Sequence, residues 1–140
     1  MWNYKVAVDW KADKVGEMRC DEKPTVEVAT PPEFGGPEKI WTPEDLLTSA
    51  VATCVMTSAL FFVNRAKIQM LSYKSNATGT MEKTAAGLVI IKISIEVFIE
   101  LEDLAQEAAT RKALEQAEKT CPLSNSLNCP VELSVQISQP

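Results

Sequence analysis

The stretch Ile40–Lys67, IWTPEDLLTSAVATCVMTSALFFVNRAK, predicts one long helix with a cysteine near its middle. Thr42 is a favourable N-cap, and Pro43 suits the first helical position because the N–H it lacks would have no partner there. Glu44 places negative charge in the first turn, where the helix dipole favours it. Cys54 lies in the centre of the apolar run that follows. The stretch therefore sets the fold and presents one candidate reactive residue.

No charged residue occurs between Leu46 and Val63. A helix that is apolar on all faces either crosses a membrane or lies in a protein core. The uncharged run is at the short end of what spans a bilayer, and it includes the hydroxyl residues Thr48, Ser49, Thr53, Thr57 and Ser58. We therefore expect the central helix of a soluble domain, with no membrane association.

Length and charge narrow the class of protein. A chain of 140 residues suits a single domain over residues 1–140 with a core of its own. The formal net charge of -5 argues against a nucleic-acid-binding surface. The first ten residues, MWNYKVAVDW, mix charge with apolar residues and do not resemble a signal peptide, so we expect a cytoplasmic protein.

The absence of histidine removes several chemistries. No Cys-His or Ser-His-Asp relay can form, and no histidine-containing zinc site. The four cysteines are Cys20, Cys54, Cys121 and Cys129, and none of them forms a CxxC pair. We therefore expect no metal and no cofactor, and two options remain for the thiols in a reducing compartment: buried inert residues or a catalytic pair.

The remaining sequence predicts an α+β fold with mainly antiparallel sheets around two long helices. Strands are expected over 2–10, 24–30, 68–82, 88–100 and 131–137, a second helix over 102–120, a turn over 11–16 and a non-helical loop over 31–37. The strongest strand pattern is 88–100, in which every second residue from Val89 to Ile99 is apolar. That side of the strand should face the core.

Three of these elements carry finer predictions. The first strand should be half buried, with its inner face formed by Trp2, Tyr4, Val6, Val8 and Trp10. The second helix should face the core through Leu104, Ala108, Leu114 and Ala117. The helix over 40–67 has no polar face, and a small sheet covers only one side of it. A second subunit is expected on the other side, which predicts a homodimer.

Two cysteines stand out as chemical candidates. Cys54 considered alone fits a buried core thiol, since free cysteine is among the most buried residue types. Cys121 ends the second helix and precedes Pro122, which biases it away from helical geometry. A thiol at such a junction can approach another thiol, so the two cysteines also fit a nucleophile and its resolving partner. Cys20 and Cys129 are interpreted as structural.

The motifs PPEFGGPEKIWTPEDLLTSAVATC and CPLSNS together resemble the family of osmotically inducible protein C and organic hydroperoxide resistance proteins (OsmC/Ohr). The glycine loop, the PE helix start, the helical cysteine and the C-P-x-S-N turn occur in the family's order. The resemblance implies an OsmC-like fold, built as an intertwined homodimer with active sites at the subunit interface.

The resemblance also implies a thiol peroxidase without haem, selenium or metal. Cys54 matches the peroxidatic cysteine, Cys121 the resolving cysteine, and Glu44 the active-site glutamate of the PE motif. Attack by the Cys54 thiolate on an organic hydroperoxide would release an alcohol and leave a sulfenic acid. Condensation with Cys121 would give a disulfide, which an external dithiol reduces. Lipoyl groups on carrier proteins are the reductant that the family suggests.

One family residue is replaced in this chain. The family holds an arginine beside the thiolate in a G-G-R-x-G turn, and here Lys14 occupies that position, with Arg19 five residues further along. Lysine keeps the charge but lacks the planar fork that binds a carboxylate through two bonds. Either cation could serve, or both could be solvated surface charges.

Glu44 presents a geometric difficulty. It precedes Cys54 by ten residues, or about 15 Å along one straight helix. The helix must break between the two residues, or Glu44 must act from the partner chain, or it serves only to stabilise the first turn.

Three functions remain open. The first is reduction of organic hydroperoxides, with alkyl or fatty-acyl peroxides favoured by the apolar neighbours of Cys54. The second is a binding protein on the same dimeric fold, with an apolar ligand in the interface pocket and catalysis lost with the arginine. The third is a thiol sensor, although no DNA-binding segment is visible in the sequence.

Overall fold

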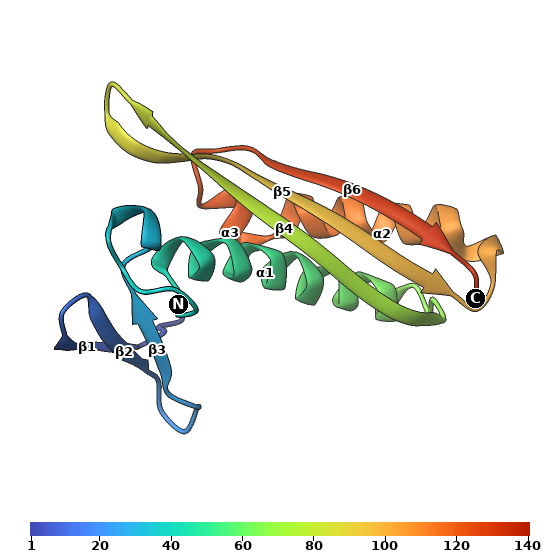
Figure 1. The fold of residues 1–140 in the computed structure, drawn as a ribbon. Coiled ribbons are helices and arrows are strands. Elements are labelled where there is room, and N and C mark those ends of the chain that lie inside the picture. The colour runs from blue at the N-terminus through green and yellow to red at the C-terminus, as the bar shows by residue number, and fades with distance from the viewer. The chain divides into compact units, whose positions relative to one another are not determined.

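A computed structural model describes all residues, 1–140. They form two compact units, Met1–Leu47 and Thr48–Pro140. The elements in chain order are β1 (Ala7–Ala12), β2 (Val15–Arg19), β3 (Val26–Ala29), the 3-10 helix η1 (Pro32–Phe34), α1 (Pro43–Arg65), β4 (Met70–Thr84), β5 (Gly87–Leu101), the 3-10 helix η2 (Leu104–Gln106), α2 (Glu107–Thr120), α3 (Pro122–Asn125) and β6 (Val131–Ser138) (Figure 1). The α+β prediction is confirmed, and the prediction of a single domain stays a prediction.

The first unit contains a three-stranded antiparallel sheet in the order β1-β2-β3. Strand β2 was missing from the sequence prediction, which assigned residues 11–16 to a turn. The turn is shorter: Ala12 already pairs with Val15, and Asp13 adopts a left-handed conformation with φ of 51°. Aspartate tolerates that conformation, so two residues suffice to reverse the chain.

The prediction of a half-buried first strand is wrong. β1 begins only at Ala7, and every residue from Met1 to Ala12 is exposed in this chain. Trp2 is 84% exposed and Trp10 is 77% exposed. The physical reason is that no second layer of the first unit packs on the side chains of β1, so their alternation has no core to face.

Helix α1 begins at the predicted cap. The Thr42 hydroxyl accepts a hydrogen bond from the Asp45 N–H at 3.1 Å, and the Thr42 N–H donates to the Asp45 carboxylate at 3.0 Å. This reciprocal pair satisfies donors that a helix start leaves unpaired. The helix then runs without a break from Pro43 to Arg65.

Only one face of α1 is buried within the single chain, as expected for an apolar helix that a small sheet covers on one side. The buried residues repeat every fourth position and are Val51, Val55, Ala59 and Val63. By length and composition α1 could cross a membrane, a property that it shares with core helices of soluble proteins.

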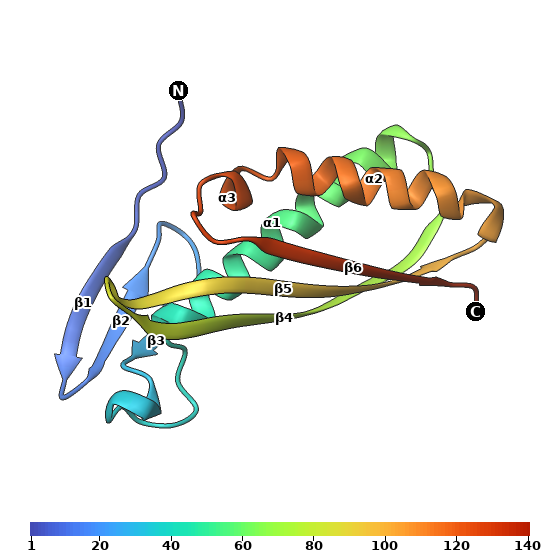
Figure 2. The same cartoon turned by 90° about the horizontal axis from the view of Figure 1, so that it is seen from above.

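The second unit packs two helices on one three-stranded sheet. The order is β4-β5-β6, with β4 and β5 antiparallel and β5 and β6 parallel. The parallel pair follows from the crossover through α2 and α3 that returns the chain to the same sheet. Figure 2 shows α1 and α2 on the same side of this sheet.

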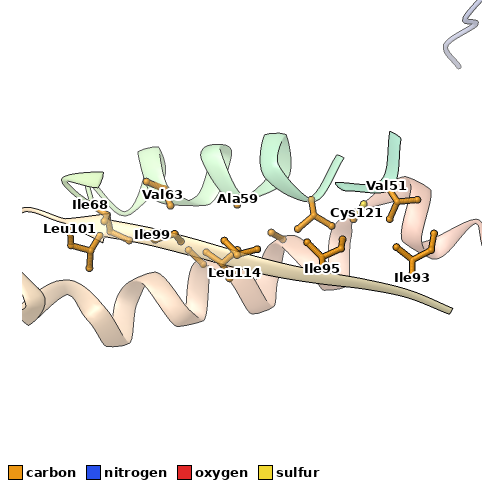
Figure 3. Packing of buried hydrophobic residues seen from close by; sticks show 14 residues of the cluster. Val51, Ala59, Val63, Ile68, Ile93, Ile95, Ile99, Leu101, Leu114 and Cys121 are labelled. Carbon is orange, nitrogen blue, oxygen red and sulfur yellow. The ribbon is translucent and has the colours of Figure 1, made fainter. Parts of the chain in front are cut away.

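The core of the second unit lies between β5 and the two helices. The predicted inward side of β5 is confirmed from Ile93 onward, where alternate residues are fully buried: Ile93, Ile95, Val97, Ile99 and Leu101. They pack with the buried face of α1 and with Ala113, Leu114 and Ala117 of α2 (Figure 3). Cys121 belongs to the same cluster and is 0% exposed.

Two predictions about local structure need correction. In the second helical segment, residues 104–106 form a 3-10 turn capped by Asp103, so α2 starts at Glu107 and its buried face is shifted. Leu104 and Ala108 are exposed, and Thr110 and Ala113 take the core positions. The loop over 31–37 contains the short helix η1, which ends at Gly35 with a left-handed φ of 86°.

Candidate active site at two neighbouring cysteines

The second unit brings Cys54 and Cys121 together. Cys54 lies on α1 beside the buried face and is half-buried against the core. Cys121 follows α2 and is the N-cap of α3, with extended backbone (φ -63°, ψ 112°) because the next residue is Pro122. The two side chains are close enough to hydrogen-bond, and both thiols are free.

The pKa values of the two neighbouring thiols are shifted in opposite directions. Burial raises the pKa of Cys54, and the hydrogen bond to Cys121 raises it further. Burial also acts to raise the pKa of Cys121, but hydrogen bonds from Cys54, Ser124 and the backbone of Leu123 outweigh it, so that the pKa of Cys121 is lowered. The pair therefore favours a single negative charge shared through one S–H···S contact.

A shallow hollow of about 390 Å³ lies beside the cysteine pair. It is lined by Thr57, Ser58, Phe61, Phe62 and Thr120. Phe61 and Phe62 meet edge to face with ring centroids 5.2 Å apart, which gives the hollow an apolar wall. Ser58 hydrogen-bonds Cys54, and Thr120 immediately precedes Cys121. An apolar molecule in the hollow would lie next to the thiols.

Sequence reasoning missed the hydroxyl groups around the sulfurs. Ser58 is four residues after Cys54, so helical spacing could have placed it on the same face. Ser124 is part of the CPLSNS motif, where only the cysteine received a role.

Lys14, the candidate cation, lies in the first unit and is held by a loop. Its Nζ donates to the Phe34 carbonyl at 2.8 Å, and its own carbonyl accepts from the Thr30 N–H at 3.1 Å. A Cβ placed on Gly35 would lie 2.6 Å from this Nζ, so the glycine leaves room for the lysine. The ammonium group is thus engaged by a backbone carbonyl.

Arg19, the alternative cation, is engaged by carboxylates of the same sheet. Its Nε donates to Asp9 at 3.0 Å across the β1–β2 pair, and Glu17 lies 3.9 Å away. The hydrogen bond to Asp9 raises the pKa of Arg19 further. Arg19 therefore has a structural partner on an exposed surface.

Glu44, the candidate glutamate, forms no ion pair with either cation. Its Oε2 is buried and has no hydrogen-bond partner. Because α1 is unbroken, the option of a helix break between Glu44 and Cys54 is excluded, and their separation along the axis stays about 15 Å.

The other two cysteines are in different settings. The Cys20 thiol donates to the Lys5 carbonyl at 3.4 Å, and Cys129 is half-buried against the core of the second unit. No group of three histidine, cysteine, aspartate or glutamate side chains is placed to hold a metal ion.

An antiparallel hairpin sheet, a long cysteine-bearing helix and a C-P-x-S-N turn that faces that cysteine define the OsmC-like class of α+β proteins. Residues 36–136 match the model of this family, described as OsmC-like protein, so the chain belongs to the OsmC family. The family resemblance expected from the motifs is thereby confirmed.

Solved structures share the fold at low sequence identity. An OsmC-like protein of unknown function from Vibrio cholerae superposes with a TM-score of 0.87 at 18% identity, covering 97% of this chain and 100% of that chain. An organic hydroperoxide resistance protein OsmC from Legionella pneumophila gives 0.72 at 19% identity, covering 99% and 98%. The organic hydroperoxide resistance protein OhrB of Bacillus subtilis gives 0.65 at 17% identity, covering 97% and 98%. A comparison with curated protein sequences found no match.

Proposed function

We propose that this protein is a thiol-dependent peroxidase that reduces organic hydroperoxides to alcohols. The observation that carries the proposal is the pair of free, hydrogen-bonded thiols of Cys54 and Cys121 beside an apolar hollow. The printed descriptions of the Legionella and Bacillus relatives, organic hydroperoxide resistance proteins, support the same role.

The reaction needs only the two thiols, the peroxide and a dithiol. The Cys54 thiolate attacks the outer peroxide oxygen, an S–O bond forms, the O–O bond breaks, and the alkoxide leaves as an alcohol after taking a proton. Cys121 then attacks the Cys54 sulfenic acid, water leaves, and a disulfide forms. An external dithiol, such as a lipoyl group on a carrier protein, restores both thiols by exchange. No metal or other cofactor is required.

The proposal includes a homodimer in the cytoplasm. Only one face of the apolar helix α1 is buried, and Phe61 on the same helix is 59% exposed. Monomeric soluble proteins rarely leave a continuous apolar surface of this kind in water. A second copy of the chain is the occupant that the family supports.

A second candidate is a binding protein for an apolar ligand. It is favoured by the state of the first unit, in which Lys14 is tied to the Phe34 carbonyl and Glu44 Oε2 lacks any partner. The cation–carboxylate pair that the family resemblance implies is not formed there, which fits a chain that retained the fold and lost the chemistry.

Peroxide consumption with a dithiol tests the two candidates. Wild type should consume cumene hydroperoxide with dihydrolipoamide as reductant, and Cys54→Ser should abolish turnover. Cys121→Ser should permit one turnover and leave a sulfenic acid that dimedone traps on Cys54. Cys129→Ser serves as the matched control and should keep the activity.

Peptide mapping after mild oxidation completes the test. The dominant disulfide should join Cys54 to Cys121 within one chain, and a bridge that includes Cys20 or Cys129 instead would refute the assignment. A wild-type protein that consumes no organic peroxide but binds a fluorescent fatty acid would establish the binding function in place of the enzyme.

A further inference from the structure

We propose that Arg111 guards the open edge of β6 against strand addition by a second copy of this chain. β6 is the last strand of its sheet and pairs only with β5. An edge strand presents unpaired backbone groups that can bind another strand, and soluble proteins block such edges, often with charged side chains. The guard involves no residue of the cysteine pair or of α1, so it is independent of the proposed peroxidase function.

The register of β5 and β6 fixes which backbone groups of β6 face the open edge. Ile93 pairs with Val131 in a parallel ladder, and the Ile93 N–H donates to the Pro130 carbonyl at 3.1 Å. The N–H and C=O groups of one strand residue point to the same edge, and successive residues alternate between the two edges. Even-numbered residues of β6 therefore bond to β5. The odd-numbered residues direct their backbone groups outward, and they are Val131, Leu133, Val135 and Ile137.

The Arg111 guanidinium occupies this open edge. Its Nη1 donates to the Val135 carbonyl, one of the outward-facing groups, at 3.0 Å. Glu107, one turn earlier on α2, accepts from Nε of the same guanidinium at 3.3 Å and from Nη2 at 3.1 Å. The planar fork of arginine lets one side chain bind the carboxylate and the carbonyl together. A positive charge is thereby fixed where the backbone of an added strand would have to lie.

The body of α2 does not close the space beside β6. Figure 2 shows α2 running beside this strand, and residues of both elements line a hollow of about 190 Å³. The Arg111 side chain is 47% exposed, so its charge stays in contact with water while it holds the Val135 carbonyl. An added strand would have to break this charge-assisted hydrogen bond and also remove the guanidinium from water. The edge is therefore blocked by one side chain and not by a covering element.

The sequence of β6 favours a second copy as the strand that would add. The strand VELSVQIS is rich in β-branched residues, carries a single charge at Glu132 and contains neither proline nor glycine. Segments of this composition readily pair with identical segments. Two β6 edges related by a twofold axis would place the outward groups of one strand opposite those of the other. Without the guard, such pairing would join molecules into larger assemblies.

Sedimentation velocity of purified variants tests the guard. Wild type should keep the same mass from low to high micromolar concentration. Arg111→Ala should form larger species, with the average mass rising about twofold or more with concentration, because each pairing doubles the mass. Arg111→Lys, which keeps a charged donor, should stay at the mass of wild type. Lys112→Ala is the matched control, because it removes the same charge from the neighbouring exposed position of α2.

Hydrogen exchange identifies the surface that associates. Samples are exchanged in deuterated buffer and then dissolved in dimethyl sulfoxide, so that NMR detects each amide even in a large assembly. In wild type, the N–H groups of Leu133 and Val135 should exchange quickly, and those of Ser134 and Gln136, which bond to β5, should be protected. In associated Arg111→Ala, the N–H groups of Leu133 and Val135 should become protected by about tenfold or more.

Three results would overturn the guard. The first is an Arg111→Ala variant with the mass of wild type at every concentration. The second is equal association of Lys112→Ala, which would make the effect one of net charge. The third is association of Arg111→Ala without new protection of Leu133 and Val135, as expected if the variant associates through partial unfolding. Should Arg111→Ala fail to fold, Arg111→Met keeps the apolar stem, lacks the charge and the donors, and decides the question in its place.

Discussion

At the scale of single residues, the two candidate cations are distinguished by their partners. Arg19 is paired with Asp9 on an exposed sheet, whereas Lys14 contacts only a neutral carbonyl, that of Phe34. Glu44 Oε2, in the same unit as Lys14, lacks any partner. Of the two candidate cations, Lys14 is therefore the one without a carboxylate partner in this chain.

Substitutions of Lys14 test this assignment through the rate of peroxide consumption. If Lys14 takes the role of the family's cation beside Cys54, Lys14→Ala should slow peroxide consumption by about tenfold or more, because a positive charge that stabilises the leaving oxygen would be lost. Lys14→Arg should increase the rate, since a guanidinium can bind Glu44 through two parallel bonds. Arg19→Ala should change little. A damaging Arg19→Ala with a silent Lys14→Ala would show that Arg19 is the functional cation.

Tyr73 offers a second test at this scale. Burial raises the pKa of Tyr73 to about 12, and its hydroxyl is buried without a hydrogen-bond partner. The Tyr73 hydroxyl ionises near pH 10 in the unfolded chain and near pH 12 in the folded protein. Because the unfolded state loses this proton first as the pH rises, the free energy of unfolding should fall between pH 10 and about pH 12. Denaturant melts should show that this fall is reduced in Tyr73→Phe.

At neutral pH the same variant should not be less stable. Removing an unsatisfied hydroxyl costs no hydrogen bond, so Tyr73→Phe should be neutral or stabilising by up to about 1 kcal/mol. Thr110→Val is the contrast, because the Thr110 hydroxyl is fully buried and donates to the Gln106 carbonyl at 2.8 Å. It should lose about 1 kcal/mol, and equal effects in the two variants would contradict the argument.

At the scale of elements, α1 depends on its start as well as on its buried face. The reciprocal pair of Thr42 and Asp45 caps the first turn, and the cap hydroxyl belongs to a residue that is only 6% exposed. The beginning of the helix therefore fixes where Glu44 and Cys54 lie along one continuous axis.

Removal of the cap should destabilise the protein measurably. Thr42→Ala should lower the free energy of unfolding by about 1 kcal/mol in chemical denaturation at fixed protein concentration. Thr53→Ala, at an exposed position in the middle of the same helix, is the control and should stay within about 0.5 kcal/mol of wild type. Equal losses in both variants would mean that the cap contributes nothing particular.

At the scale of the whole molecule, the exposed apolar surface is the main unexplained feature of the protomer. It occurs in both units: on β1 and the residues before it, and on the uncovered faces of α1. Within each unit no element of the same chain covers it. The homodimer proposed above is the arrangement that would remove this surface from water.

Sedimentation of the purified protein tests the dimer. No stable species of monomer mass should be present at micromolar concentration. Phe61→Glu should shift the equilibrium toward monomer, because a carboxylate then enters an apolar contact. Gln116→Glu, on the exposed side of α2, adds the same single negative charge and should leave the dimer intact. A monomeric wild type would refute the proposal.

Most of the helices and strands, and the two candidate site cysteines, could be predicted from the sequence by itself. The cap at Thr42 and the alternation along β5 are local patterns, and local patterns specify helix starts and buried strand faces directly. The family motifs pointed to Cys54 and Cys121, and the structure places their thiols within hydrogen-bonding reach.

Only the tertiary structure decided which surfaces are covered and which polar groups have partners. The alternation of the N-terminal segment predicted a buried face, yet β1 is an edge strand with nothing packed on it. In the sequence, Lys14, Arg19 and Glu44 all carry charges that suit the roles implied by the family. In the structure, the Phe34 carbonyl binds Lys14 and Asp9 binds Arg19, whereas Glu44 Oε2 has no partner. Burial and hydrogen bonding depend on residues distant in the chain, so no local pattern could have fixed them.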